Sequence, residues 1–380
     1  MLDIQEYCNS KSIISGIERF VKDHAVHYSS CSTDLDSIIK MIKNNAKGIM
    51  PTNEYDSFRK AISYLVNGKT FTLKRENLFR LCFSLNLQSD IDAQDLFTNY
   101  LHQNELSARS LEEFLFIASL KLHLSYIDFI EIRNYFQNDI KNQSLSPQDT
   151  NEGLTAVVYY TAMNNIHNKE ELIEYLSDWD NLSFFAKTRN TQYLALFSDV
   201  ELETIYSASD EQLVRLVTDY GSTERETIYS YYLSLFGLQT PDSDATLSEE
   251  EINNLAEKFE GIFMSYDNFC DLVQRKRPVD ISSGTFLLNL LKMLITDDNS
   301  SDMDFYVDFS DYDDFYGVIN DILTYFGFPT LNTECDSFDS LVVDVYDEII
   351  AENPVATNME LQRIYLDKLR YYLSKIACEQ

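Results

Sequence analysis

The chain has 380 residues, of which 62 are acidic and 30 basic, and its formal net charge at pH 7 is −32. Such a surface repels nucleic acids and anionic lipids over a Debye length of about 8–10 Å, which argues against a general polyanion-binding protein. With 10 glycines and 6 prolines, the chain has too few turn-forming residues for the tight hairpins of a β-sandwich or barrel. Since 44 % of the residues are hydrophobic, buried cores are expected, and we predict an all-α protein.

The first segment with candidate chemistry is RFVKDH, residues 19–24. Arg19 and His24 have the Arg-x4-His spacing of the helical nucleases known as the HEPN family, and this resemblance implies catalysis on an RNA phosphate. His24, His27 and Cys31 also follow one another at helical spacing, with Cys8 nearby in sequence. A structural zinc site normally shows two closely spaced ligand pairs, so we predict neither a metal nor a cofactor. An RNase is kept as an alternative function.

The basic residues concentrate in the first 140 residues, where we place an N-terminal helical module. Residues 1–150 contain 16 bases and 19 acids, a balance of −3. This part of the chain could therefore meet a polyanion, whereas ordinary solvated charge paired with local carboxylates is the simpler interpretation. The candidate contacts for nucleic acid are Arg59, Lys60, Lys69, Lys74 and Arg75, with Arg80 close by.

Helix starts are indicated by three capping patterns. Ser110 with Glu113 and Ser248 with Glu251 match the capping box, in which a serine and a glutamate three residues later satisfy each other's backbone N–H groups. Apolar residues then recur at spacings of three and four, which is typical of amphipathic helices. Ser209 with Gln212 predicts a further helix start.

Two polar stretches, residues 141–153 and 237–248, divide the chain. Both are rich in Ser, Asp, Gln, Pro and Gly, so we interpret them as linkers. The expected domains are the N-terminal helical module (1–140), a middle helical region (153–237) and an acidic C-terminal helical module (248–380). Residues 241–380 contain 9 bases and 29 acids, a balance of −20, so nucleic acid is not expected at this module.

Two blocks of sequence recur in the same order, which predicts a duplicated helical module. Segment 65–85 (LVNGKTFTLKRENLFRLCFSL) is similar to 272–294 (LVQRKRPVDISSGTFLLNLLKML). Segment 95–115 (DLFTNYLHQNELSARSLEEFL) is similar to 321–342 (DILTYFGFPTLNTECDSFDSLV). We therefore expect two related modules joined by the middle region.

Each copy also resembles a known kind of module. Helices such as NEYDSFRKAISYLVNG (53–68) and MSYDNFCDLVQRK (264–276) precede a basic loop and an apolar helix. This order resembles the degenerate, lambda-repressor-like helix-turn-helix modules found in uncharacterised helical proteins of low-GC Gram-positive bacteria. The resemblance covers roughly half of the chain and implies a helical fold more strongly than DNA binding. A DNA-binding regulator that uses the N-terminal copy is a second alternative.

The segment TDDNSSDMDFYVDFSDYDDFYG (296–317) has eight aspartates and six aromatic residues without a lysine or arginine. It lacks the central glycine of an EF-hand calcium loop, although a looser divalent site at Asp302, Asp304 and Asp308 stays open. Its rings favour burial, so we expect rings on one side and carboxylates on the other. The predicted partner-binding residues are Asp302, Asp304, Asp308, Asp311, Asp313, Asp314, Tyr312 and Tyr316.

Taken together, these patterns predict a regulatory or interaction protein without enzymatic activity. Its acidic surface would dock a basic protein, itself a candidate nucleic-acid binder, in a mobile-element or phage-conflict setting that the resemblance and the charge imply. The six cysteines are scattered, no apolar run approaches 18 residues, and the N-terminal sequence lacks a signal-peptide core. We accordingly expect a cytoplasmic protein without membrane contact.

Overall fold

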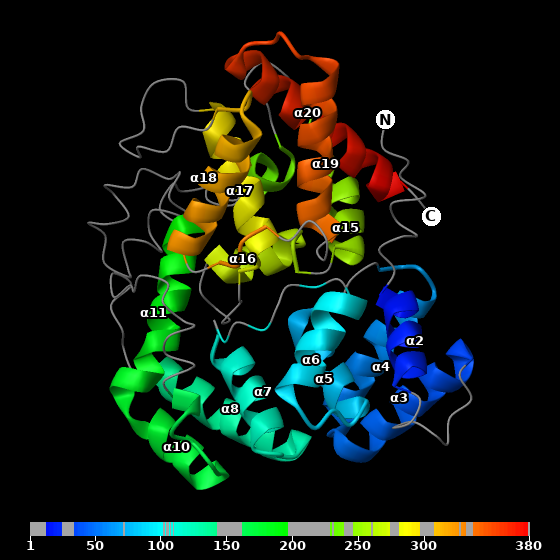
Figure 1. Ribbon diagram of the computed structural model, residues 1–380, viewed down its shortest axis with the longest axis vertical. Helices are drawn as coiled ribbons and strands as arrows, with labels where there is room; N and C mark the ends of the chain where they lie inside the picture. Colours follow the sequence, from blue (N-terminus) through cyan, green and yellow to red (C-terminus); the bar gives the residue numbers. More distant parts are fainter. Residues whose placement is uncertain are drawn as a thin grey trace.

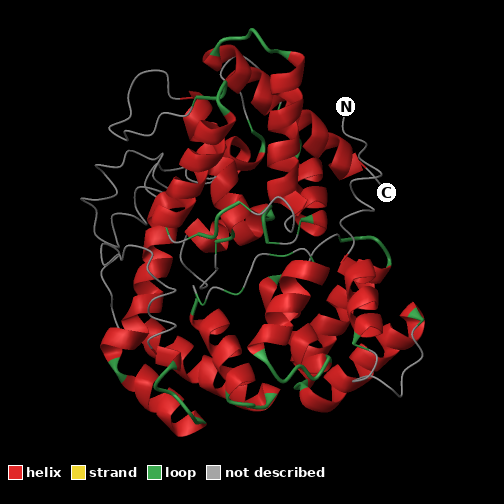
Figure 2. Cartoon of the chain, viewed as in Figure 1, coloured by secondary structure: helices red, strands yellow, loops and turns green. Residues whose placement is uncertain are grey.

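The described part of the chain in the computed structural model consists of helices joined by loops and turns (Figure 2). It describes residues 13–24, 34–70, 73–101, 103, 106, 108, 110–142, 162–196, 229, 232–238, 246–259, 261–273, 281–296, 308–326, 328–331 and 337–378. Within these ranges every regular element is a helix and no strand occurs. The all-α prediction is confirmed.

The N-terminal half forms the lower part of the molecule in Figure 1. In this half α2 packs on the π-helix η1, α3 on α5, and α7 on α8. The helices are α2 (Ile13–Asp23), α3 (Leu35–Ile49), α4 (Thr52–Val66), α5 (Arg75–Ser84), α6 (Asp90–Asp95), η1 (Leu96–Tyr100), α7 (Leu111–Lys121) and α8 (Tyr126–Asn142).

The C-terminal half forms the upper part, and α11 runs along one side from the lower half to the upper (Figure 1). α11 contacts α8 below and α17 above, while α15, α17 and α19 all pack on the last helix, α20. The helices are α10 (Lys169–Ser177), α11 (Trp179–Leu196), α15 (Glu249–Lys258), α16 (Tyr266–Val273), α17 (Ser283–Thr296), α18 (Tyr312–Tyr325), α19 (Ser337–Glu352) and α20 (Asn358–Cys378).

Each half has its own hydrophobic core, so the described chain contains two separate clusters of buried apolar side chains. One contains buried side chains from Ile13 to Phe185, and the other from Leu196 to Ala377. The boundary falls within α11, so the described residues of the expected middle region (153–237) divide between the two clusters. Apolar burial on this scale is the dominant favourable contribution to folding.

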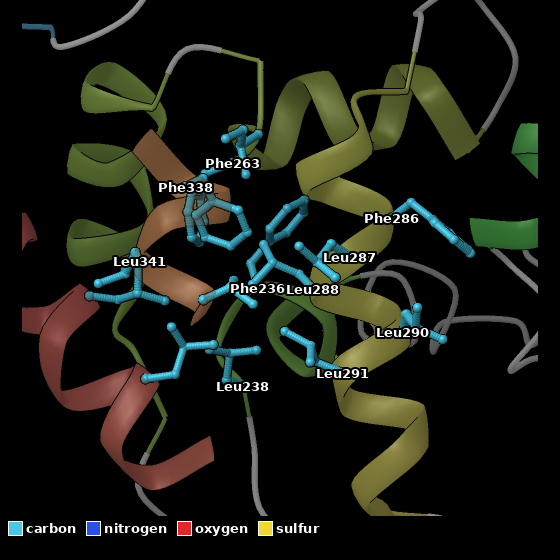
Figure 3. Packing of buried hydrophobic residues seen from close by; sticks show 14 of the residues in the cluster. Phe236, Leu238, Phe263, Phe286, Leu287, Leu288, Leu290, Leu291, Phe338 and Leu341 are labelled. Carbon is cyan, nitrogen blue, oxygen red and sulfur yellow. The ribbon is translucent and has the colours of Figure 1, made fainter. Parts of the chain in front are cut away.

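The apolar helix α17 lies at the centre of the second cluster (Figure 3). Its Leu287, Leu288 and Leu291 point toward Phe236, whereas Phe286 and Leu290 lie on the other side of the helix. Phe286 stacks on Phe328 with ring centroids 4.6 Å apart. A helix that is apolar on all sides is expected to be buried, and the local sequence SGTFLLNLLKML therefore explains its position.

The blocks that recur in the sequence lie in helices of the same order. The first block spans the end of α4 and α5 in one half, and the end of α16 and α17 in the other. The second block spans α6, η1 and the start of α7, and then α18 and the start of α19. The pair α7–α8 packs as α19–α20 does, but α3 packs on α5 whereas α15 packs on α20. The two halves thus share the order of these helices but differ in part of their packing. Duplication of a module stays a prediction.

The predicted helix starts differ in detail. Ser248 and Glu251 form the complete capping box at α15. At α7 the Ser110 hydroxyl accepts from the Glu113 backbone N–H, but the Glu113 carboxylate binds Arg75 instead of closing the box. The segment with Ser209 and Gln212 lies outside the described residues.

Candidate functional site

In the described part of the aspartate-rich aromatic segment, the phenylalanine rings are turned inward. Phe309 and Phe315 are fully buried, and the Tyr316 hydroxyl donates to the Leu331 carbonyl at 3.0 Å. Asp311 and Asp313 are exposed and Asp308 is half-buried. Asp302 and Asp304, and the side chains of Tyr312 and Asp314, lie outside what the structure describes. From residue 308 onward the carboxylates thus lie on the outside of the aromatic residues.

The start of α18 and the residues just before it are fixed against α19 and the first residue of α20. The Phe309 backbone N–H donates to Asn358 Oδ1 at 2.7 Å, and the Tyr346 hydroxyl donates to the Phe309 carbonyl at 3.0 Å. Phe315 stacks on Tyr346 with centroids 4.0 Å apart. The bond to Asn358 places Phe309, and with it Asp308, next to the first residue of α20.

The turn that joins α19 to α20 and the first turn of α20 each carry one of the most exposed apolar side chains of the described residues. Val355 is 95 % exposed and Met359 is 62 % exposed. An open groove of about 480 Å³ beside them is lined by residues 352–356, Glu360, Arg363 and Ile364. The turn lies at the top of the molecule in Figure 1. We group Val355, Met359 and Glu360 with Asp308, Asp311 and Asp313, which lie at and just before the start of α18, and call this set the acidic tip.

Two carboxylates of the acidic tip are held in their ionised form. The Asp308 carboxylate accepts from the Ser310 hydroxyl at 2.7 Å and its backbone N–H at 2.9 Å, and these bonds lower the pKa of Asp308. The Glu360 carboxylate accepts from the Thr357 backbone N–H at 2.8 Å and its hydroxyl at 2.9 Å, which lowers the pKa of Glu360. Hydrogen bonds to a carboxylate favour its charged form, so both groups stay negative well below neutral pH.

The predicted nucleic-acid contacts have unequal surroundings. Arg75 binds the Glu113 carboxylate, with its Nε 3.0 Å from Oε1. Arg59 lies 3.8 Å from Asp56, and Lys74 precedes the first residue of α5. Lys60 and Lys69 are exposed, and both ammonium groups lie over the ring of Tyr64, at 5.2 and 5.3 Å from its centroid. The structure therefore brings Lys60 and Lys69 together and engages Arg75 elsewhere.

Arg80 belongs to a buried ion-pair network that sequence reasoning did not predict. Arg80 binds Glu54 and Glu76, while Arg133 binds Glu112 at 2.9 Å and Glu54 at 3.3 Å. The arginine side chains are only 6 % and 9 % exposed. The network joins α4, α5, α7 and α8, so Arg80 serves internal packing and is not available to a phosphate.

Arg19 and His24 both lie against the ring of Tyr100, whereas the RNase alternative requires them to converge on an RNA phosphate. The Arg19 guanidinium lies 5.1 Å from the centroid of the Tyr100 ring, and the His24 ring lies 6.0 Å from it. In addition, Arg19 Nη2 donates to the Asn99 carbonyl at 2.6 Å, and His24 Nδ1 lies 2.9 Å from the Phe20 carbonyl. Because a carbonyl only accepts, Nδ1 must donate, which leaves Nε2 as the basic nitrogen of the neutral ring. His27, Cys31 and Cys8 of the zinc hypothesis lie outside the described residues.

Sequence reasoning also missed three lysines of α3. Lys40, Lys43 and Lys47 recur at spacings of three and four, which places them on one side of the helix. That spacing was the signal that could have found them.

The described ranges contain neither a cluster of metal ligands nor a membrane-spanning helix. Within those ranges no three His, Cys, Asp or Glu side chains gather in an arrangement that could hold a metal ion. None of the helices described combines the length and apolar character needed to cross a bilayer. No family model, curated protein or solved structure matches the chain.

Proposed function

We propose that the chain is a docking protein without enzymatic activity, and that its acidic tip binds a basic protein. The observation that carries this proposal is the exposure of Val355 and Met359, together with Glu352 and Glu360 in the groove that Val355 lines. Protein interfaces are typically organised around buried apolar anchors with a polar rim, and the acidic tip has both parts.

The chemistry of the acidic tip favours one class of partner. Its carboxylates repel nucleic acid and anionic lipid, and they attract lysine and arginine side chains. A partner surface rich in Lys and Arg, with an apolar side chain to cover Val355 and Met359, would satisfy both components. Proteins that bind nucleic acid commonly carry such basic surfaces.

Different residues of the acidic tip would control different steps of binding. Complementary charge mainly accelerates the encounter of two proteins, whereas desolvated apolar anchors mainly slow their separation. Asp311 and Asp313 are thus expected to control association, and Val355 and Met359 dissociation.

The RNase alternative has weaker support. Arg19 Nη2 and His24 Nδ1 each use a donor on a backbone carbonyl, and these contacts also explain the two residues as parts of the packing between α2 and η1. The DNA-binding alternative is weakened because Arg75 and Arg80 bind carboxylates of the protein itself, Glu113 and Glu54.

The proposal can be tested by capture followed by kinetics. Immobilised wild-type chain, exposed to extract of the cells that make it, should retain basic proteins that a wash at high salt releases. With the captured protein purified, Asp311→Asn/Asp313→Asn should lower the association rate and flatten its salt dependence. Val355→Ser/Met359→Ser should raise the dissociation rate about tenfold or more, because two apolar anchors worth roughly 1 kcal/mol each are lost.

The matched control is Glu257→Gln/Asp267→Asn, which removes the same charge from exposed positions on α15 and α16. It should bind as the wild type does. Equal loss of binding in the control and the Asp311/Asp313 variant would show that net charge alone attracts the partner, and would contradict a role for the acidic tip.

A further inference from the structure

A surface of the N-terminal half gathers five lysines in an otherwise acidic protein. Lys40, Lys43 and Lys47 lie on one side of α3, which packs against α4. Lys60 lies on α4 and Lys69 directly after it. α3 and α4 lie in the lower half of Figure 1, away from the acidic tip. We call these five residues the lysine face.

The local backbone holds Lys69 beside Lys60. α4 ends in a Schellman motif, in which the Lys69 N–H donates to the Tyr64 carbonyl at 2.9 Å and the Gly68 N–H to the Leu65 carbonyl at 3.1 Å. Gly68 has φ = 68°, a left-handed conformation that favours glycine. The chain thereby turns back, so that both ammonium groups lie over the Tyr64 ring.

The lysine face is also distinguished by its lack of carboxylate partners. Elsewhere lysines pair with acids, as Lys22 does with Glu18, Lys121 with Asp90 and Lys169 with Asp128. Within the described residues none of the five lysines of the face forms an ion pair, and Lys43 donates to the Ser63 hydroxyl at 3.2 Å. In a chain with about two acids for each base, this leaves a local excess of positive charge open to a ligand.

The composition of the lysine face favours phosphates over a protein. Among the described residues of α3 and α4, Val66 is the one large apolar side chain that is exposed, at 39 %. The face therefore has no central apolar anchor, and lysine is depleted at protein interfaces. From Lys40 to Lys47 the helix rises about 10 Å, which matches about three phosphates of one strand.

We propose that the lysine face binds the phosphate backbone of nucleic acid, independently of the acidic tip. The contact is with phosphates rather than base edges, so it is insensitive to base sequence. The net charge of −32 opposes a polyanion at long range, so binding is expected at low salt and weakens steeply as salt is added.

The test is fluorescence anisotropy with a labelled 24-nucleotide single strand and the corresponding duplex, between 20 and 200 mM NaCl. Five phosphate contacts predict a slope of log affinity against log salt of about −3.5 for the single strand and −4.5 for the duplex. Lys40→Gln/Lys43→Gln/Lys47→Gln should reduce the steepness by about two to three and weaken binding at 50 mM salt by about tenfold or more. Lys60→Gln/Lys69→Gln should reduce the slope by about 1.5 to 2.

The control is Lys22→Gln/Lys187→Gln/Lys375→Gln, which removes three charges from helices outside the lysine face. Circular dichroism of all variants checks that the helices persist. We expect unchanged spectra, because the substitutions are at the surface. Absence of binding by the wild type at 20 mM salt would overturn the proposal, as would equal losses in the control and the α3 variant. A loss of salt-sensitive self-association in the α3 variant, without any change in nucleic-acid binding, would instead assign the face to a second copy of the chain.

Discussion

Glu54 bridges the two buried arginines of the N-terminal half. Its carboxylate binds Arg80 and Arg133, and it accepts from the Tyr126 hydroxyl at 3.1 Å. Burial by itself raises the pKa of Glu54, but the charges of Arg80 and Arg133 outweigh burial and hold the pKa below its ordinary value. The stabilisation from Glu54 is thus present above its unfolded-state pKa of about 4.3 and is lost as the pH falls through the lower folded-state pKa.

We expect Glu54→Gln to lower the free energy of unfolding by about 2–3 kcal/mol at pH 7, because two buried guanidinium groups lose the carboxylate between them. The difference from the wild type should shrink as the pH falls from about 5 to about 3, where the wild-type carboxylate becomes protonated. Urea unfolding at a series of pH values measures both effects.

Asp56→Asn is the control at this scale. Arg59 and Asp56 are both more than half exposed, so their separation should cost about 0.5 kcal/mol or less. If the two variants were equally stable at pH 7, the buried network would not contribute as argued.

At the scale of elements, the packing of α2 on η1 depends on one glycine. A Cβ at Gly16 would lie 1.9 Å from the Tyr100 carbonyl oxygen and 3.3 Å from Leu101 Cδ2. The first distance is far too short for a carbon atom, and a backbone carbonyl has little freedom to move away, whereas the second is only a tight contact with a side chain. The sequence shows only a glycine inside a helical pattern, and the tertiary contact supplies the reason for it.

Gly16→Ala should therefore destabilise the protein by about 2 kcal/mol or more, although alanine favours a helix by about 1 kcal/mol. Gly48→Ala is the matched control, because no atom lies within 4 Å of its Cβ position. That variant should be neutral or stabilised by up to about 1 kcal/mol. Thermal unfolding of the two variants gives the comparison, and a shift of the same sign in both would contradict the steric argument.

The helix caps illustrate what local sequence predicts and where it stops. Ser248 and Glu251 pair with each other as the pattern indicates. Ser110 also caps its helix, but Arg75, which is distant in sequence, binds the Glu113 carboxylate. The capping box therefore forms in full at α15, where its two residues bind each other. At α7 only half of it forms, because tertiary packing brings Arg75 to the Glu113 carboxylate.

At the scale of the whole molecule, charge is distributed unevenly between the two halves. Residues 1–150 have a balance of −3 and residues 241–380 one of −20. The lysine face lies in the lower half of Figure 1 and the acidic tip at the top. The molecule could therefore hold a basic protein at one end while the other end contacts phosphates.

The net charge of −32 also predicts how stability responds to salt. Like charges repel one another in the compact state, and added salt screens this repulsion. Raising NaCl from about 20 to 200 mM should increase Tm by a few degrees, which corresponds to a gain in the free energy of unfolding on the order of 1 kcal/mol. Differential scanning calorimetry measures this change in Tm, and KCl at equal ionic strength serves as the control for specific ion effects. A decrease in Tm would mean that ion pairs such as those of Arg133 outweigh the general repulsion.

By itself, the sequence determined the helical class, the burial of Phe309 and Phe315 beside the exposed Asp311 and Asp313, and the charge difference between the halves. These properties follow from composition and periodicity, which act along a single helix. Only the tertiary structure decided that Arg80 is buried among glutamates, that α11 is divided between two hydrophobic clusters, and that Val355 and Met359 are exposed. These outcomes depend on contacts between segments far apart in sequence, and no pattern within one helix specifies which distant side chain will meet it.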